Sequence, residues 1–265
     1  KTTPECPLTH EDFKNHYGQE WATEVINYTN PTETDEYNID ATITGGSDER
    51  FKEHMQNEKR IMQIIASRNY ISAHGKDGLS NALYRFAKQE ATTMFKLIFK
   101  AILITKHVPA SWTKTKTIML YKKSDPNLPG NWRPIGITST MYRVFTAHIS
   151  AFINIENKKK DVFHPSQRGF IGGRGNGAHD HINSLNELIA HAKRTNSKCV
   201  LTAIDLTNAF GSVPHQLIFD TLKQKGFGST FRTIIEDLYA NSETSIEVKS
   251  QRSETIKIRR GVIQG

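Results

Sequence analysis

The chain has 265 residues, of which 37% are hydrophobic and 9% aromatic, enough to bury the core of one large domain or of two modest ones. No apolar run reaches the length of a membrane span, and the first residues lack the hydrophobic region of a signal peptide, so we expect no contact with a membrane. Two cysteines far apart in the chain exclude a disulfide framework and a zinc site, and they fit a reducing intracellular compartment.

The formal net charge of +8 is unevenly distributed. Residues 1–50 contain three basic and eleven acidic residues, a net charge of −8, so the rest of the chain carries +16. A basic body of this size attracts polyanions, and phosphate contacts from lysine and arginine make such binding salt-dependent. The alternative is a basic surface that only keeps the protein soluble.

The acidic N-terminal segment predicts little regular structure apart from a helix over 11–28, where apolar and aromatic residues recur at every fourth position. We assign no chemistry to this segment. A charged helix is predicted over 50–68, and two glycines then bracket a loop at 75–78. Ser80 is expected to cap one long amphipathic helix, whose apolar stripe would be Leu83, Phe86, Met94, Ile98 and Ile102.

A basic hairpin is predicted next. Residues 112–121 have the composition of a strand, which ends at Lys122 and Lys123, and a second short strand would carry Arg133 back. This arrangement suits a triphosphate, because arginine offers a planar fork of donors and lysine a flexible point charge. The alternative is a solvated basic hairpin.

A glycine-rich stretch follows a predicted helix over 138–155. Residues 167–177 contain five glycines, which allow a ligand to approach the backbone closely, and Arg168 and Arg174 lie among them. The backbone of a nucleic acid is therefore a candidate ligand, although a glycine-rich loop alone is a weak signal. Another helix is expected after it, with apolar residues at 182, 185, 188 and 189.

A carboxylate stands near the end of an apolar segment. Residues 200–206 alternate in a way that predicts a strand, Asp205 lies close to its end, and Ser212 and Pro214 are expected to begin a helix. A lone carboxylate among hydrophobic neighbours is costly unless something positive faces it, such as a metal ion. The alternative is an ordinary surface or capping aspartate at a strand end.

The C-terminal part predicts two helices over 214–225 and 229–240, followed by a hairpin of strands over 245–249 and 255–259. The second strand leads directly into Arg260 and Gly261.

Five segments together resemble the motifs of reverse transcriptases. Asp205 followed by Ala209-Phe210 resembles the first palm motif. The other four segments, in the family's order and spacing, are Gly75-Lys-Asp77-Gly-Leu, Lys122-Lys123 with Gly130-Asn-Trp-Arg133-Pro-Ile, Gln167-Arg-Gly-Phe170-Ile-Gly-Gly-Arg174-Gly, and Arg260-Gly-Val-Ile-Gln264-Gly265. The combination is similar to the non-LTR retrotransposon (LINE-like) branch and covers roughly residues 70–265. Lys76 departs from the pattern, which usually has proline there.

This resemblance implies an α+β fold of the right-hand polymerase type, with the fingers and the first part of the palm, truncated before the rest of the palm and the thumb. The expected division is an acidic N-terminal extension and linker over 1–69, fingers with their preceding helices over 70–199, and the first part of the palm over 200–265.

The resemblance also implies roles for individual residues. Asp205 would be the catalytic carboxylate and, with the backbone carbonyl of Leu206, a ligand of Mg²⁺ or Mn²⁺. The nucleotide would be bound by Lys122, Lys123, Arg133, Phe210 and Gln264. Phe210 would act as a steric gate that favours deoxyribonucleotides, its alternative being an ordinary core aromatic. The template would be bound by Gln167, Arg168, Gly169, Phe170 and Arg174.

The implied activity is RNA-templated DNA synthesis, with an RNA template, a DNA primer and dNTP as partners, and with a nuclear phase in the life of the protein. The two adjacent aspartates of the family pattern would follow Gly265, and one carboxylate cannot hold two magnesium ions well. We therefore expect residues 1–265 alone to be inactive and expect an enzyme if the chain continues. The alternatives are a domesticated nucleic-acid-binding or scaffold protein without catalysis, and an unrelated basic α/β protein.

Overall fold

The structure is a computed structural model, and it describes residues 4–25, 46–160, 163–164, 166–167, 169–170 and 177–263. Contacts within the chain define two compact units. The first combines Lys1–Ser150 with Asn208–Gly265, and the second is Ala151–Thr207. Each unit is described by itself below. The expected domain boundaries at residues 69 and 199 stay a prediction.

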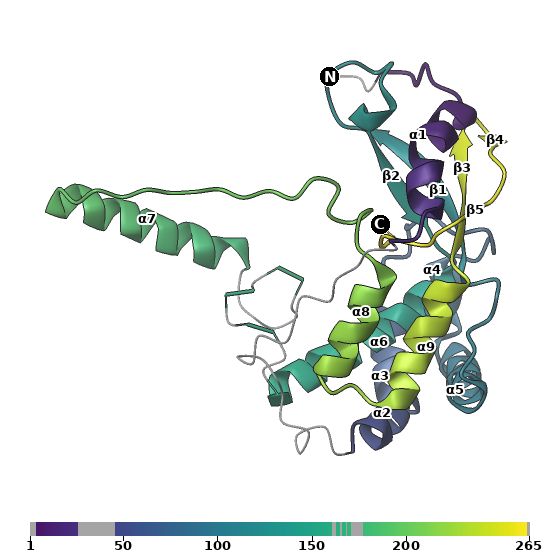
Figure 1. The fold of residues 1–265 in the computed structure, drawn as a ribbon. Coiled ribbons are helices and arrows are strands. Elements are labelled where there is room, and N and C mark those ends of the chain that lie inside the picture. Colours follow the sequence, from purple (N-terminus) through teal and green to yellow (C-terminus); the bar gives the residue numbers. More distant parts are fainter. Residues whose placement is uncertain are drawn as a thin grey trace. The chain divides into compact units, whose positions relative to one another are not determined.

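The first unit is built on a small mixed sheet (Figure 1). Its strands are β1 (Lys114–Tyr121), β2 (Trp132–Ile137), β3 (Glu243–Val248), β4 (Gln251–Arg252) and β5 (Ile256–Lys257). The order is β2-β1-β3-β4, and β5 also pairs with β3. β1 and β3 run parallel, while the other pairs are antiparallel. The basic hairpin is confirmed. The C-terminal hairpin is confirmed only in part, because the strand expected over 255–259 is reduced to Ile256–Lys257, and the partner that directly follows the turn is the short strand β4.

The N-terminal helix α1 (His10–Ala22) lies against this sheet (Figure 1). Its residues Phe13, Tyr17 and Trp21 are buried in one cluster with Trp132 and with apolar residues of β3 and β5. The hydroxyl of Tyr17 donates to the backbone carbonyl of Trp132 at 2.8 Å. The predicted helix over 11–28 is thus confirmed as far as Ala22, and its residues 26–28 lie outside the described part of the chain. This part of the acidic segment packs against the sheet as part of the core.

The remaining helices of the first unit form a second, largely aromatic core. They are α2 (Ser47–Met55), α3 (Glu58–Ser67), α4 (Asn81–Phe86), α5 (Lys88–Thr105), α6 (Thr140–Lys160, which continues into the second unit), α8 (His215–Gln224) and α9 (Ser229–Ala240). Phe51 of α2 meets Phe231 of α9 edge to face, with ring centroids 5.1 Å apart. Phe99 of α5 meets Phe145 of α6 in the same way at 5.5 Å. Edge-to-face pairs of this kind add to the stabilisation from burial.

Two helices that the apolar pattern of the sequence predicts to be continuous are each interrupted in the structure. The helix expected over 50–68 divides at Gln56, and the side chain of Asn57 caps α3 by accepting from the backbone N–H of Arg60 at 3.0 Å. The long helix expected after Ser80 divides at Ala87, and Ser80 makes no side-chain cap bond. Because the helix is interrupted there, Tyr84, Phe95 and Phe99 are buried in place of the predicted apolar stripe at this point. Phe86, which belongs to the predicted stripe, is 92% exposed.

A buried histidine pair joins α2 and α6. The Nε2 of His54 donates to the backbone carbonyl of His148, and the Nε2 of His148 donates to that of His54, both at 2.8 Å. Burial lowers the pKa of His54 to about 4 and that of His148 to about 3, because the charged imidazolium would lose its hydration. Both rings are therefore neutral in the folded protein at pH 7.

The second unit contains the predicted helix α7 (Ala178–Thr195). The strand predicted over 200–206 is wrong: among the described residues no strand pairs with this segment, and Val200, Ile204 and Leu206 are 90%, 86% and 73% exposed. An alternating sequence gives a segment one apolar face, but a β-strand forms only when its backbone groups make hydrogen bonds to a neighbouring strand. In the described part of the chain, no helix is long and apolar enough to cross a membrane.

Candidate active site

The two segments of the first unit that match palm motifs lie together. The backbone N–H of Val262 donates to the carbonyl of Phe210 at 2.7 Å, and that of Gly261 donates to the carbonyl of Val213 at 2.7 Å. The ring of His215 also donates from Nε2 to the carbonyl of Gly261 at 3.0 Å. These hydrogen bonds join two backbone segments that lie about 50 positions apart in the sequence.

Glycine at position 261 is required by this close approach. Its φ of +85° is a conformation that residues with a Cβ adopt rarely, and a Cβ there would stand 2.8 Å from the carbonyl oxygen of Gly211. The helix after this junction starts later than predicted, since α8 begins at His215 with Pro214 at its N-cap. Ser212 belongs instead to a turn in which its N–H donates to the carbonyl of Asn208.

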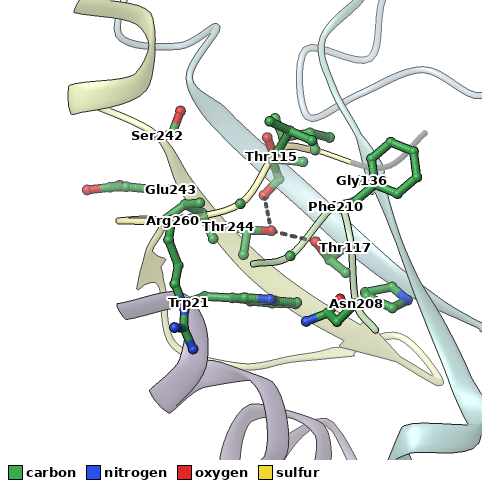
Figure 2. Close-up of a pocket in the computed structure, with 16 residues that line it drawn as sticks. Trp21, Thr115, Thr117, Gly136, Asn208, Phe210, Ser242, Glu243, Thr244 and Arg260 are labelled. Carbon is green, nitrogen blue, oxygen red and sulfur yellow. Dashed lines mark hydrogen bonds between the residues drawn. The ribbon is translucent and has the colours of Figure 1, made fainter. Parts of the chain in front are cut away.

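A small cavity opens beside the junction (Figure 2). The threonines Thr115, Thr117 and Thr244 line it from β1 and β3, with the hydroxyls of Thr117 and Thr244 2.7 Å apart. Phe210 and Trp21 line it from the loop before α8 and from α1. Its volume of about 70 Å³ is far below the several hundred Å³ typical of ligand sites, so it holds at most part of a ligand.

The C-terminal end of α1 is fixed to the same junction. The guanidinium of Arg260 donates from Nε to the carbonyl of Glu20 at 2.6 Å, and Arg259 forms an ion pair with Glu24 at 3.0 Å. The side-chain amide of Asn208 donates to the carboxylate of Glu20 at 2.6 Å. α1 therefore contacts both motif segments.

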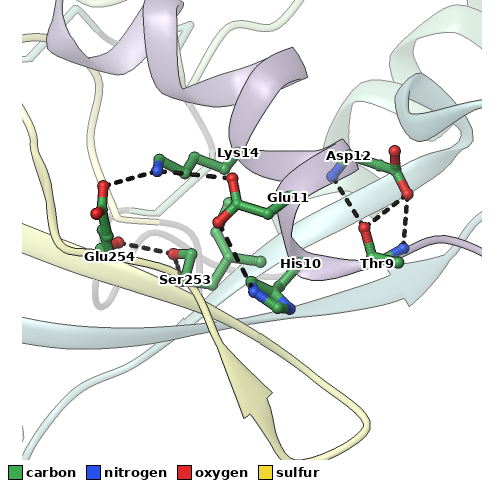
Figure 3. A network of polar contacts seen from close by, with 8 residues as sticks. Thr9, His10, Glu11, Asp12, Lys14, Ser253 and Glu254 are labelled. Carbon is green, nitrogen blue, oxygen red and sulfur yellow. Dashed lines mark hydrogen bonds and ion pairs between the residues drawn. The ribbon is translucent and has the colours of Figure 1, made fainter.

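The other end of α1 is held by a second polar network (Figure 3). Thr9 and Asp12 form a capping box, with the Thr9 backbone N–H donating to the Asp12 carboxylate at 2.8 Å. Lys14 bridges to Glu254 beyond β4 at 2.9 Å. The helix is thus tied to the sheet near both of its ends.

The basic hairpin presents its cations as predicted. Arg133 pairs in register with Leu120, and the backbone N–H of Lys122 donates to the carbonyl of Asn131 at 2.9 Å. Residues two apart in a strand share a face, so Lys122 and Arg133 project from the same exposed side of the hairpin, while Tyr121 turns toward the core. Lys123 is also exposed and lies past the end of the strand.

The predicted template residues lie in the second unit and are described only in part. Gln167 is exposed, and its side-chain amide donates to the carbonyl of Gly169 at 3.0 Å. Phe170 is 96% exposed and has a φ of +62°. Arg168, Arg174 and, at the other end of the chain, Gln264 lie outside the described residues.

Asp205 and Leu206 also belong to the second unit, in the exposed segment that forms no strand within the described residues. The described residues contain no group of three or more His, Cys, Asp or Glu side chains that could hold a metal ion. The carboxylate of Asp205 and the carbonyl of Leu206 offer too few oxygens for Mg²⁺, which takes six ligands. The described residues thus do not by themselves fit the family's metal site.

Sequence reasoning missed two contributions to this site. The spacing of Phe13, Tyr17 and Trp21 showed a helix, but not that Trp21 would line the cavity beside Phe210. The alternating threonines of Lys114-Thr-Lys-Thr117 are the signal in the sequence that β1 presents hydroxyls on one face.

Comparisons with known proteins identify the family of the chain. The family described as "Reverse transcriptase (RNA-dependent DNA polymerase)" matches residues 121–265, more than half of the chain. The transposon TX1 uncharacterized 149 kDa protein of Xenopus laevis is 26% identical over 220 residues, which cover 82% of this chain and 16% of that protein.

Proteins of the retrotransposable element R2 are similar as well. The type-1 R2 Pol polyprotein of Popillia japonica is 28% identical over 200 residues, or 73% of this chain and 26% of that protein. The type-2 R2DM polyprotein of Drosophila melanogaster is 26% identical over 194 residues, or 73% of this chain and 18% of that protein. The chain spans about a quarter or less of the length of these relatives. It belongs to the reverse transcriptase family, and its relatives confirm the resemblance to the non-LTR retrotransposon branch.

Proposed function

We propose that the chain forms the fingers and the first part of the palm of an RNA-templated DNA polymerase in a retrotransposon protein, with a right-hand polymerase architecture. The observation that carries this proposal is the junction of residues 208–215 with residues 260–262 beside the cavity lined by Phe210. Two segments that resemble palm motifs are expected to meet at the nucleotide in such an enzyme, and here they meet through backbone hydrogen bonds.

Nucleotide binding is proposed for the basic hairpin and for Phe210. Lys122 and Arg133 share an exposed face, and Lys123 lies beside them at the end of the strand, so three cations are available to the phosphates of a dNTP. Phe210 lines the cavity and is positioned to press against a sugar, which would favour deoxyribonucleotides. Gln264 is proposed to touch the nucleotide or its template partner.

Template binding is proposed for the glycine-rich stretch that begins at Gln167. An exposed aromatic ring at Phe170 offers a surface on which a base can stack, and Gly169 permits close approach of a backbone. Arg168 and Arg174 would contact phosphates. The partners in this proposal are an RNA template and a DNA primer, and the protein would act in the nucleus for part of its cycle.

Catalysis is proposed to depend on Asp205. Reverse transcriptases use Mg²⁺ or Mn²⁺, and Asp205, with the carbonyl of Leu206, would contribute the first oxygens to that site. Since these oxygens do not suffice, the activity belongs to a protein that also supplies the two adjacent aspartates of the family pattern.

The proposal is tested by separating catalysis from binding in the full-length protein. Asp205→Asn removes one carboxylate charge without changing the size of the side chain, so it should abolish DNA synthesis and leave RNA affinity within about twofold. Glu58→Gln on α3 is the matched control, because it makes the same carboxylate-to-amide change at an exposed residue that pairs with Lys96 and lies outside the proposed site. It should change neither quantity.

Equal loss of synthesis and RNA binding in Asp205→Asn would assign Asp205 a structural role and contradict the proposal. A full-length protein that binds RNA and synthesises no DNA would support the non-catalytic alternative.

A further inference from the structure

A second, larger cavity in the first unit lies where α8, α9 and β5 meet. Its volume is about 640 Å³, within the range of sites that hold small ligands. Three features of its lining matter: an aromatic wall, two cations and two side chains that can form hydrogen bonds. Ile258 is the lining residue it shares with the cavity beside Phe210.

The aromatic wall consists of His215, Phe219 and Tyr239. The ring centroids of His215 and Tyr239 are 4.7 Å apart, and those of Phe219 and Tyr239 are 6.1 Å apart. The bond from His215 to the carbonyl of Gly261 fixes the imidazole, and burial lowers its pKa, so the ring is neutral at pH 7. The planes of His215 and Tyr239 are tilted by 55° and those of Phe219 and Tyr239 by 70°, so a planar ligand can stack on one neutral ring while its edge meets another.

The two cations that line the cavity come from β5 and from the residues directly after it. Lys257 and Arg259 alternate with Ile256, which is buried in the sheet cluster, so both project away from that cluster. The backbone of Arg259 is fixed because its N–H donates to the carbonyl of Trp21 at 2.8 Å. Its side chain is paired with Glu24, but 67% of the Glu24 side chain is exposed, and an exposed pair of this kind is weak. A phosphate can therefore replace Glu24 as the partner of Arg259.

Polar groups are also available at the cavity. Tyr239 lines the cavity, and burial raises the pKa of its hydroxyl, so the hydroxyl stays neutral and can donate. Gln216 of α8 lines the cavity and carries both a donor and an acceptor, although its amide also donates to Asp220 at 2.8 Å.

We propose that this cavity binds one unpaired base of a single-stranded nucleic acid. The base stacks on the ring of His215, its edge meets the hydroxyl of Tyr239, whose ring is tilted by 55° to that of His215, and its phosphate lies between Lys257 and Arg259. A single strand is favoured over a duplex because only an unpaired base can leave its neighbours and enter a pocket. The net positive charge of this body attracts such a strand over longer distances. This contact requires no synthesis and holds whether or not the protein is a polymerase.

The first test measures affinity for a fluorescently labelled ten-nucleotide single-stranded RNA without dNTP or metal, using the 265-residue protein. The double variant Lys257→Ala/Arg259→Ala should weaken binding by about tenfold. The matched control Lys249→Ala/Arg252→Ala removes two cations from the neighbouring turn and β4, where Lys249 pairs with Glu5 and Arg252 with Glu247. It should change affinity by less than about twofold. Equal weakening of RNA binding in the two double variants would overturn the proposal. The loss of affinity would then depend on the overall charge of the protein and not on this cavity.

The second test locates the base directly. RNA carrying 4-thiouridine is cross-linked by light to the wild-type protein, and the modified peptide is identified by mass spectrometry. Cross-links to peptides of α8 or α9 that contain His215 or Tyr239 are expected, and a duplex of the same sequence should not compete. Cross-links confined to other peptides, or equal competition by the duplex, would contradict base capture here. Since Asp205→Asn should bind this RNA like the wild type, failure of this proposal is distinguishable from failure of the polymerase proposal.

Discussion

At the scale of single residues, the junction between the two motif segments depends on Gly261. We expect Gly261→Ala to lower the free energy of unfolding by about 2–4 kcal/mol, because the new Cβ adds both an unfavourable φ and a clash with the carbonyl of Gly211. Urea unfolding followed by circular dichroism measures the change.

Gly78→Ala is the control for this prediction. Gly78 has a similar φ of +66°, but a Cβ there would meet nothing within 4 Å, so the cost should be about 1 kcal/mol. A Gly261→Ala variant no less stable than Gly78→Ala would show that residues 208–215 and 260–262 do not approach as described.

The buried pair of His54 and His148 predicts how stability depends on pH. Both pKa values are lowered on folding, so below pH 6.5 the unfolded state binds more protons and stability falls as the pH falls. Between pH 6.5 and 5, the free energy of unfolding should drop by about 2 kcal/mol for each histidine. The groups that face the pair are each other's rings and the guanidinium of Arg60, which also disfavours the charged form.

Replacing one ring should remove about half of this dependence. His148→Gln keeps a side-chain donor and no longer titrates, whereas His191→Gln on the exposed surface of α7 is a control that should leave the slope unchanged. Equilibrium unfolding in urea at several pH values between 7 and 5 measures the slope. A slope unaffected by His148→Gln would mean that this pair does not control acid stability.

At the scale of elements, α1 is predicted to be part of the core and not an appendage. Phe13 is fully buried against the sheet, so Phe13→Ala should cost about 3–5 kcal/mol of unfolding free energy. Phe86→Ala, at a ring that is 92% exposed, should cost less than about 0.5 kcal/mol. Similar small losses in both variants, measured by urea unfolding, would show that α1 is dispensable for the fold.

Much of the fold could be predicted from local sequence, and the failures share one cause. Helices such as α6 and α9 and the basic hairpin were found because their apolar periodicity and turn residues are local signals. The break at Ala87 and the unpaired state of residues 200–206 depend on neighbours that are distant in sequence, which periodicity does not encode. The spacing of Phe13 and Trp21 indicated a helix, but the surface against which it packs depends on the same distant contacts.

The site was predictable to a similar degree. Motif resemblance identified Phe210 and Arg260, which the structure brings to one junction, and Lys122 and Arg133, which share one face of the hairpin. The roles of Asp205 and of the template residues from Gln167 to Arg174 stay predictions. The aromatic and basic cavity near His215 could not be predicted at all, since it is made by α8, α9 and β5 only once they pack.

At the scale of the whole molecule, the basic body, the family match over residues 121–265 and the junction of motif segments support one account, RNA-directed DNA synthesis. The chain spans about a quarter or less of the length of these relatives, so RNA-directed DNA synthesis by the whole protein stays a proposal. Residues 1–265 alone should extend no primer, because they offer the metal ions a single proposed carboxylate.

The most direct test is primer extension by the full-length protein on an RNA template, with dNTP and magnesium. The account predicts a DNA product whose sequence is complementary to the template. Formation of this product requires pairing between the RNA and the primer, and the product should be absent with the Asp205→Asn variant. A full-length protein that binds the template and primer but makes no product, or an Asp205→Asn variant that makes it at the wild-type rate, would contradict the account.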